Sequence, residues 1–503
     1  GIYSQYSYRV DVIADNVLHD LSGNGIYMGY SSKNGSGIIR DNKILETSST
    51  SIQMESKDTF HIYGNVIDGG NGNGMRLQSS KSLTVRSNTI QNKDDTGMYI
   101  ESSTGNATSQ WKVVSNVIKD NGSYGLRINY ASVNVDSNTI SGHSNTGVYI
   151  QTNFESPAAD TLRYNTIINN GSYGIYVNDY AGPFVQYNDL YGHSSYDYYN
   201  SATTGNELDA RYNFWGTATT AEMNTGNNPK DIAKIYDKYD DDDKGFVNYG
   251  GWLGSSGGNP TSTSYTGVFK LTDSGGAEQL NFPSDSTLYL RVTDSDRNSN
   301  SGTAETITTT IKSETETTAE NLTLTETGAN TGIFSGSIVF EVATSFTNGD
   351  SKLQVQKGDK LTGTYIDPAN DFGNEYTVTD VAFYDVSLKS GTISTNTTWA
   401  KADSPFLVTG DVTVNSGKTL TIEAGSEVRF TPLSDDQSSG EDQNRPELTV
   451  KGTLIANGTA SDTIVFTSNA ETPASGDWYG IYLRDSNASG SFKYNNIAYA
   501  TYG

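Results

Sequence analysis

The feature that most constrains this chain is an asparagine that recurs through its first half, each time followed by two short strand-like segments. Successive copies lie 22 to 28 residues apart. The spacing inside each unit is tighter, because a small residue opens the second segment nine residues after the asparagine in most copies. The asparagines are Asn16, Asn42, Asn65, Asn88, Asn116, Asn138, Asn165, Asn188 and Asn213, and the small residues are Gly25, Ser51, Gly74, Gly97, Gly125, Gly147 and Gly174.

A repeat of this length, made of short strands without a helical period, predicts a β-solenoid in which each unit is one coil of a parallel β-helix. Side chains alternate along a strand, so Ile175 and Val177 are expected to point inward and Tyr176 outward. The repeated asparagines are expected to stack on one another as a ladder of side-chain amides.

These units resemble the right-handed parallel β-helix repeats of the pectin-lyase-like superfamily. The resemblance rests on the Asn-Thr-Ile, Asn-Val-Ile and Gly-Ile-Tyr units, and Tyr212–Gly216 is similar to the last coil of many surface proteins of that type. It implies a fold more than an activity, because this fold hosts lyases, hydrolases, adhesins and inert spacers.

Residues 1–253 are therefore predicted to be the C-terminal coils of a parallel β-helix with a capping helix. The helix is expected over Asn228–Tyr239, where Ile232, Ile235, Tyr236 and Tyr239 fall at the spacing of one apolar helical face. Such a helix would cover the open end of the solenoid, which otherwise exposes unpaired strand edges.

Residues 254–261 are rich in Gly and Ser and predict a flexible linker. Residues 262–386 then alternate apolar and polar side chains in strands such as Thr287–Val292, with turn signals every ~8–12 residues, which predicts a β-sandwich. Within them, Leu324–Phe334 resembles a hairpin that is common in immunoglobulin-like modules of large bacterial surface proteins. The expected fold class is thus all-β, a parallel β-helix plus an immunoglobulin-like β-sandwich.

Residues 387–503 resemble the N-terminal cap and first coils of another parallel β-helix. Asn495 begins one more unit, whose second strand would start at position 504. If residue 1 is counted as 504, Gly1–Tyr3 falls there, and the next asparagine, Asn16, follows Asn495 at a normal spacing. The sequence therefore predicts that each unit continues into residue 1 of an identical unit, either covalently in a tandem-repeat protein or by head-to-tail stacking.

Composition restricts the partners and the location. The formal charge of −25 disfavours nucleic acid and anionic membranes as partners. No apolar run approaches the ~20 residues that cross a bilayer, so membrane insertion is not expected. Abundant Gly, Tyr, Ser, Thr and Asn suit turn-rich extracellular β-structure, and the expected location is extracellular or at the cell surface.

No catalytic constellation emerges from the coils. The outward positions of the second strands are Tyr27, Arg76, Tyr99, Arg127, Tyr149 and Tyr176, which form no acidic cluster. His143 and His193 each lie five residues after an asparagine and are interpreted as equivalent turn positions. The chain is therefore expected not to be an enzyme.

One loop of the sandwich has the spacing of a calcium site. Asp294, Asp296, Asn298 and Asn300 place oxygen atoms at alternate positions, which lets a tight loop surround Ca²⁺. Asp367 and Asp371 could add ligands from a second loop. The equally weighted alternative is an acid-rich turn that holds no metal.

The outward tyrosines on successive coils are expected to stack in rows. Such rows could bind the sugar rings of surface glycans, but a self-supporting aromatic ladder is the preferred interpretation. Taken together, the sequence predicts a structural subunit of an extracellular filament or cell-surface fibre, whose partners are other copies of itself. The alternative is a secreted β-helix protein that binds or cleaves polysaccharide, or a cell-surface adhesin.

Overall fold

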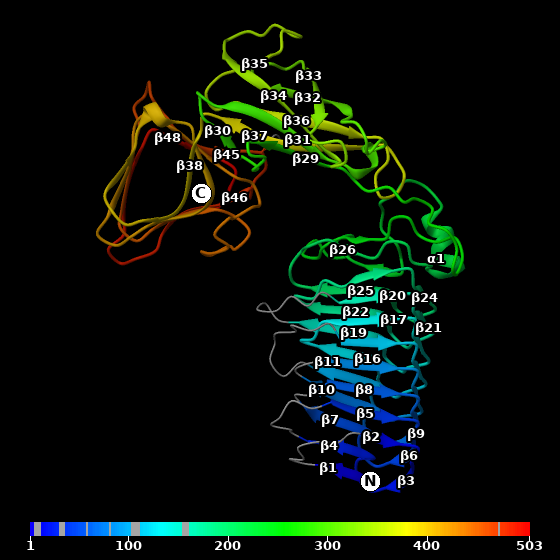
Figure 1. Cartoon of the computed structure of the whole chain (residues 1–503). Helices are drawn as coiled ribbons and strands as arrows, with labels where there is room; N and C mark the ends of the chain where they lie inside the picture. The colour runs from blue at the N-terminus through cyan, green and yellow to red at the C-terminus, as the bar shows by residue number, and fades with distance from the viewer. Residues whose placement is uncertain are drawn as a thin grey trace. The chain divides into compact units, whose positions relative to one another are not determined.

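The computed structural model describes residues 1–4, 12–29, 36–56, 59–79, 82–101, 111–152, 160–470 and 473–502. Gly503, at the expected junction between units, lies outside the described residues. Almost all regular structure in the described residues is β-strand, as predicted. The chain divides into two compact units, Gly1–Ser264 with Asp371–Asn374 and Tyr265–Asn370 with Glu375–Gly503 (Figure 1).

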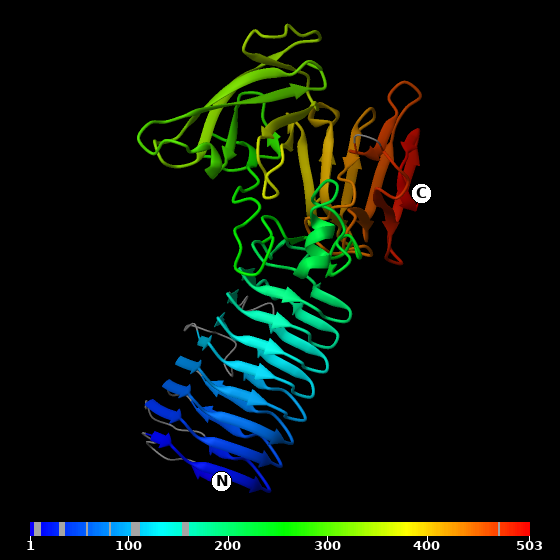
Figure 2. The ribbon, with the colours of Figure 1, turned by 90° about the vertical axis from the view of Figure 1, so that its right-hand side faces the viewer.

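The first unit is a parallel β-helix, built from three parallel sheets to which the chain contributes strands in rotation (Figure 2). Sheet 1 contains β1 (Ile2–Ser4), β4 (Ile26–Met28), β7 (Ile52–Ser56), β10 (Met75–Ser79), β13 (Met98–Glu101), β16 (Tyr124–Asn129), β19 (Thr146–Thr152), β22 (Tyr173–Asp179), β25 (Tyr196–Ala202) and β27 (Ile235–Tyr236). Sheet 2 contains β2 (Val12–Ala14), β5 (Ser36–Arg40), β8 (Thr59–Tyr63), β11 (Ser82–Arg86), β14 (Trp111–Val114), β17 (Val133–Asp136), β20 (Thr161–Arg163) and β23 (Phe184–Gln186). Sheet 3 contains β3 (Val17–Leu21), β6 (Lys43–Thr47), β9 (Val66–Gly70), β12 (Thr89–Gln91), β15 (Val117–Lys119), β18 (Thr139–Ser141), β21 (Thr166–Ile168) and β24 (Asp189–Tyr191).

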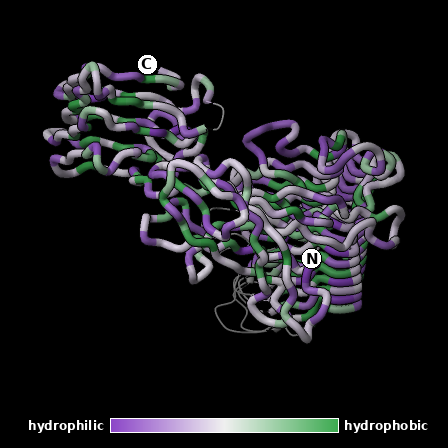
Figure 3. The backbone as a smooth tube through the Cα atoms, turned by 90° about the horizontal axis from the view of Figure 1, so that it is seen from above, coloured by the Kyte–Doolittle hydropathy of each residue, from purple (hydrophilic) through white to green (hydrophobic). Residues whose placement is uncertain are grey.

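The predicted inward and outward positions are confirmed. Ile175 and Val177 are fully buried, and Tyr176 between them faces outward in register with Tyr149 of the preceding coil. The residue two after each asparagine supplies a second inward column, because it follows the same alternation in sheet 3. This column is Ile44, Ile67, Ile90, Ile118, Ile140, Ile167 and Leu190, all fully buried. Figure 3 shows the resulting alternation of hydrophobic and hydrophilic stretches.

The predicted capping helix is wrong in position. Asn228–Tyr239 contains turns and the short strand β27, whereas the helix of this region is α1 (Gly216–Met223). Ile232 and Ile235 are buried as the apolar pattern requires. However, β27 pairs with β25 and adds a tenth strand to sheet 1, and this pairing overrides the helical periodicity of an isolated segment. Beyond it, β26 (Leu208–Asp209) and β28 (Val247–Asn248) form a two-stranded parallel pair.

Residues 265–384 form a nine-stranded, mostly antiparallel sheet around its own core. Its strands are β29 (Val268–Thr272), β30 (Asn281–Phe282), β31 (Thr287–Thr293), β32 (Thr306–Ser313), β33 (Glu320–Glu326), β34 (Ile333–Val342), β35 (Lys352–Val355), β36 (Lys360–Asp367) and β37 (Tyr376–Tyr384), with a 3-10 turn at Ser295–Arg297. Leu290, Leu324 and Phe334 are fully buried in this core. All nine strands are hydrogen-bonded into one continuous sheet, and the immunoglobulin-like arrangement stays a prediction.

Residues 387–502 form the predicted second set of parallel coils. One sheet contains β38 (Ser387–Ile393), β40 (Phe406–Val414), β42 (Glu427–Phe430), β43 (Glu447–Val450), β45 (Ile464–Ser468), β46 (Trp478–Leu483), β48 (Asn495–Ile497) and β49 (Ala500–Tyr502); the other contains β39 (Thr397–Trp399), β41 (Thr419–Ile422), β44 (Thr453–Asn457) and β47 (Ser489–Lys493). A 3-10 turn at Lys401–Asp403 joins β39 to β40. The core includes Phe430 stacked on Trp478, with ring centroids 3.9 Å apart.

Candidate functional site

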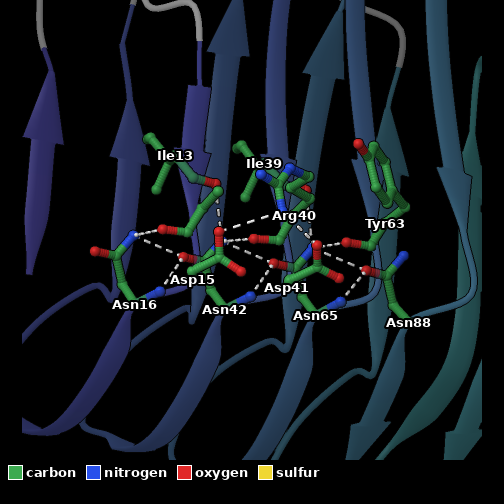
Figure 4. A network of polar contacts seen from close by, with 11 residues as sticks. Ile13, Asp15, Asn16, Ile39, Arg40, Asp41, Asn42, Tyr63, Asn65 and Asn88 are labelled. Atoms are coloured by element: carbon green, nitrogen blue, oxygen red, sulfur yellow. Dashed lines mark hydrogen bonds and ion pairs between the residues drawn. The ribbon is translucent and has the colours of Figure 1, made fainter.

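The asparagine ladder forms as predicted and is the main polar device of the first unit (Figure 4). The side-chain oxygen of Asn42 accepts hydrogen bonds from the Asn16 backbone N–H and from the Asn16 side-chain amide, at 3.1 and 2.8 Å. The same pair of bonds recurs at every later step to Asn213. From Asn42 onward every asparagine of the ladder is buried. Each turn of the coil is therefore locked to the next by a fully paired side chain.

The residue before each ladder asparagine belongs to the same turn, and its role was not predicted from the sequence. Asp15 and Asp41 have φ values of 61° and 54°, in the left-handed region that redirects the chain into sheet 3. Their carboxylates flank Arg40, whose guanidinium lies 3.2 Å from Asp15 and 2.7 Å from Asp41. Asp, Ser and Gly fill this position in the early coils and Tyr in the later ones, so residue type alone gives only a weak signal.

A second polar ladder runs five residues after the asparagines and contains the two histidines. His143 Nδ1 accepts the backbone N–H of Asn121 at 3.2 Å, and His143 Nε2 lies 3.1 Å from the Ile118 carbonyl, to which it donates. Asn170 repeats this role one coil later, accepting the His143 N–H and donating to the Ile140 carbonyl. Burial lowers the pKa of His143 to about 4, so the ring is neutral in the folded protein.

His193 lies at the same level two coils further and is also buried. Its Nδ1 is 2.7 Å from Asp197, and its Nε2 is 3.3 Å from the Asn170 amide. Both rings are thus engaged inside the helix, and the prediction that they occupy equivalent positions is confirmed. This geometry offers no exposed imidazole for proton transfer at either residue.

The outward face of sheet 1 carries the predicted row of tyrosines and arginines, which we call the tyrosine column. In register it comprises Tyr3, Tyr27, Gln53, Arg76, Tyr99, Arg127, Tyr149, Tyr176, Tyr199 and Tyr236. Tyr176 stacks between Tyr149 and Tyr199, with centroids 5.4 and 4.9 Å apart. The Arg127 guanidinium lies over Tyr99 and Tyr149 at 5.1 and 5.3 Å from their centroids.

This stacking decides what the tyrosine column can present to a ligand. Neighbouring rings such as Tyr199 and Tyr236 are 4.3 Å apart and tilted by only 17°, so each covers the face of the next. A sugar ring stacks on an exposed aromatic face, and the interior of the column offers mainly ring edges and hydroxyls. The contacts therefore favour the self-supporting ladder.

Beside the tyrosine column lies a row of carboxylates and amides that the sequence analysis did not single out. Glu55, Gln78 and Glu101 are in register on successive strands, facing outward. Glu101 lies 3.6 Å from Arg76 and accepts a hydrogen bond from Gln78 at 2.8 Å, while Glu55 accepts from the Tyr27 hydroxyl at 3.3 Å. Two strand spacings place the backbones of Glu55 and Glu101 roughly 10 Å apart. The signal was present in the sequence as the outward position two residues beyond the tyrosine column.

The predicted calcium loop is folded by protein contacts. Asp294 and Asp367 are buried, and Asp296 and Asn300 are exposed. Asp294 accepts the Asp296 N–H at 2.9 Å and the Tyr365 hydroxyl at 2.6 Å. Asp367 accepts the Gly267 and Ala369 N–H groups.

The other predicted ligands bond elsewhere. The Asn298 amide donates to Asn330 at 2.8 Å, and Asn300 accepts the Gly302 N–H. Asp371 belongs to the first unit, where it pairs with Arg211 at 2.8 Å. Over the part of the chain that the structure describes, no three Asp, Glu or His side chains are grouped in a way that could hold a metal ion. The Asn298 side-chain oxygen is buried without a hydrogen-bond partner among the described residues, and calcium at this loop stays a prediction.

The outermost coils present apolar side chains whose counterparts one coil inward are buried. Leu483 is 43% exposed, whereas Val450, its partner in register, is 0% exposed. Ile497 is 41% exposed against 0% for Phe466. At the other end, Ile2 and Leu18 are half-buried, whereas their partners in register, Ile26 and Ile44, are 0% exposed. The outermost described coil at each end therefore leaves part of its apolar core uncovered.

The asparagine ladder is incomplete at the same places. The Asn16 side-chain oxygen accepts no hydrogen bond from the described residues, although every later ladder asparagine accepts two. Asn495 has the local geometry of a ladder asparagine, since Tyr494 before it has φ of 49° and its amide donates to the Ala456 carbonyl at 2.9 Å. The same two features occur at Asn165 in the ladder. Tyr164 before it has φ of 57°, and the Asn165 amide donates to the Val135 carbonyl, also at 2.9 Å.

Solved structures similar to this chain include two from phage tailspikes. The enzymatically active domain of tailspike protein 2 from bacteriophage CBA120 is 10% identical, with a TM-score of 0.31, and the match covers 76% of this chain and 72% of that one. Full-length tailspike protein 2 from the Escherichia coli O157:H7 bacteriophage is 9% identical, with a TM-score of 0.27 and coverage of 75% and 64%. No curated protein matches the chain. A likeness this weak carries no inference about activity.

Family models match both sets of coils. Residues 1–160 and 105–213 match the family described as right handed beta helix region, and residues 391–503 match the pectate-lyase like beta helix domain. No helix in the described part of the chain is long and apolar enough to cross a membrane. The parallel sheets and these two matches agree, and the protein is an all-β chain with right-handed parallel β-helix repeats.

Proposed function

We propose that the protein is a structural subunit of an extracellular filament or cell-surface fibre, in which β-helix coils of one copy stack end to end on those of the next. The observation that carries this proposal is the pair of outermost coils, which expose apolar residues, together with an asparagine ladder in which no described residue donates to the Asn16 side-chain oxygen. An open strand edge and a slice of apolar core form a strong template for another strand. Stacking that does not close on itself builds filaments.

In this proposal the Asn495 amide donates to the Asn16 oxygen of the next copy, which continues the ladder across the junction. Covalent tandem repeats and separate stacked chains would use the same contacts. The immunoglobulin-like module of residues 262–386 would then act as a spacer between successive β-helices. The coils carry no catalytic function in this account.

Sedimentation of the purified chain tests the proposal. We expect concentration-dependent association, because each copy presents both faces. An Ile497→Asp variant places a charge in the interface and should reduce association strongly, since an unpaired buried charge is costly. Val342→Asp is the matched control, because Val342 is also exposed and apolar but lies on β34. A wild-type chain that stays monomeric, or equal association of both variants, would contradict stacking through these faces.

The row beside the tyrosine column supports a second proposal, a β-helix protein that binds or cleaves polysaccharide. Glu55 and Glu101 share one outward face with Gln78 in register between them, and Arg76 lies beside Glu101. Their backbones are roughly 10 Å apart, and an inverting glycosidase uses two carboxyl groups about 6.5–9.5 Å apart, a separation that the side chains of two such residues can adopt. Incubation with acidic and neutral polysaccharides should then release reducing ends. Glu55→Gln and Glu101→Gln should each abolish this release. Glu207→Gln should not, because Glu207 lies between β25 and β26, away from this row. If the protein neither cleaves nor binds any of these glycans, this second proposal is wrong and the structural role is the one that stands.

A further inference from the structure

Two glutamates are buried at one end of the nine-stranded sheet, Glu316 in the turn between β32 and β33 and Glu320 at the first residue of β33. Glu316 is 0% exposed and Glu320 is 3% exposed. One Glu316 oxygen accepts the Gln354 N–H at 2.9 Å, and the other is buried with no hydrogen-bond donor. Glu320 accepts the Gly349 N–H from the loop between β34 and β35. A buried carboxylate oxygen without a donor is costly and calls for a partner.

Glu320 lies close enough to Glu316 to act on its titration, yet neither carboxylate can donate to the other when both are ionised. Burial, reinforced by Glu320, raises the pKa of Glu316 to about 7. Among the described residues, no lysine or arginine nitrogen comes within ion-pair distance of either glutamate; Lys352, at this end of the sheet, pairs instead with Glu341 at 2.9 Å. Two acidic groups are therefore buried together, and no cationic side chain among the described residues neutralises them.

The surroundings of this pair are also rich in oxygen. Asp350 lies near enough to add to the negative potential at Glu316. The Gln354 side-chain amide donates to Asp350 and Glu341, at 3.1 and 3.0 Å, which turns its own oxygen toward the Thr347 N–H. Carboxylate and carbonyl oxygens, with water completing the shell, are the ligands that Ca²⁺ prefers.

We propose that Glu316 and Glu320 bind a calcium ion that joins the β32–β33 turn to the loop between β34 and β35. The ion would neutralise both carboxylates and complete the unpartnered Glu316 oxygen. This site is separate from the calcium loop predicted at Asp294–Asn300, and it does not depend on the proposed filament function. Two protein carboxylates, supplemented by carbonyls and waters, are its expected ligands.

Calorimetric titration of the full chain with CaCl₂ at pH 7.5, after treatment with chelator, tests the site. We expect Glu316→Gln and Glu320→Gln each to remove one bound calcium ion per chain. Glu314→Gln is the matched control, because Glu314 lies on the same turn but is exposed. An Asp294→Asn, Asp296→Asn double variant should keep the binding that depends on Glu316, which distinguishes the two loops.

Thermal melting of the wild type provides a measurement that does not depend on any variant. Calcium should raise the melting temperature above that in chelator, because it binds only the folded site. Two results would overturn the proposal: wild-type binding retained in Glu316→Gln, or a wild type that neither binds calcium nor melts higher in its presence. The second result would indicate that the pair shares a proton instead.

Discussion

At the scale of single residues, the protein relies on side chains that can donate and accept at once. A side-chain amide does both, so one residue type can be repeated indefinitely along the helix axis without leaving a polar group unpaired. The buried asparagines provide this continuity on one side of the coil. On the other side the requirement is looser, and His143 and Asn170 fill equivalent positions with the same donors and acceptors.

An Asn116→Ala substitution tests the cost of interrupting the ladder. It removes the acceptor of the Asn88 N–H and side-chain amide and the donor to the Val85 carbonyl, all of them buried. We expect the free energy of unfolding to fall by about 3 kcal/mol or more, since three buried groups are left unpaired and each costs about 1–3 kcal/mol. Urea unfolding followed by circular dichroism measures this loss. Asn71→Ala, at an exposed turn position, should change stability far less.

The second ladder makes a prediction about pH. The folded-state pKa of His143, about 4, lies below its unfolded value near 6.5, so the unfolded chain takes up a proton first as the pH falls. His143 therefore lowers stability progressively as the pH drops from about 6.5 to about 4, by about 3 kcal/mol in total.

His143→Asn should remove this contribution, because Asn170 shows that an amide makes the same two bonds at this level. Stability at pH 8 should then stay within about 1 kcal/mol of the wild type, and the acid side of the stability profile should flatten. Denaturant melts at a series of pH values measure it. A profile with unchanged slope between pH 6.5 and 4 would show that His143 is not buried neutral.

At the scale of elements, the turns between strands constrain the coil as much as the strands do, because backbones of successive coils approach closely there. A Cβ atom added to Gly147 would lie 2.7 Å from the Gly174 carbonyl oxygen of the next coil, which explains the small residue nine positions after most of the ladder asparagines. The tyrosine column then supports sheet 1 from outside. Its rings stack because the strands that carry them are spaced at the distance of aromatic contact.

Tyr176→Ala tests whether the tyrosine column supports the sheet or serves a ligand. Loss of the stacks with Tyr149 and Tyr199 should lower stability by about 1–2 kcal/mol. Tyr376→Ala, on an exposed position of β37, should have little effect. If Tyr176→Ala leaves the unfolding midpoint unchanged but abolishes binding to a glycan array, the column is a binding platform instead.

The sequence was informative where the fold is periodic. The fixed offset from Asn165 to Gly174 predicted strand register and the inward columns, because a solenoid repeats one local environment. The prediction from sequence was wrong at the last coil of the β-helix. There the apolar spacing of Ile232 and Ile235 fits an α-helix, but the segment pairs with sheet 1 as a strand. The buried glutamates were also missed, since only the tertiary structure brings the turn at Glu316 to the loop at Gly349.

At the scale of the whole molecule, the formal charge of −25 opposes association between copies, whereas the open coil faces favour it. Like charge on the flanks opposes side-to-side association between copies. The coil faces are the places where apolar surface and unpaired strand edges occur together, so association is expected to be directed along the β-helix axis. Higher ionic strength should promote this association, because it screens the repulsion between copies.

Disulfide cross-linking tests the end-to-end account most directly, because the chain contains no cysteine of its own. If Asn495 precedes Asn16 in the ladder, Asn496 pairs with Val17 of the next copy, just as Val17 pairs with Lys43 within the chain. Adjacent parallel strands place such partners at a separation that a disulfide can bridge. A Val17→Cys, Asn496→Cys variant should therefore form a ladder of covalent multimers under mild oxidation, reversed by reductant. No multimers, or equal multimers from a Val17→Cys, Val342→Cys control, would contradict the account.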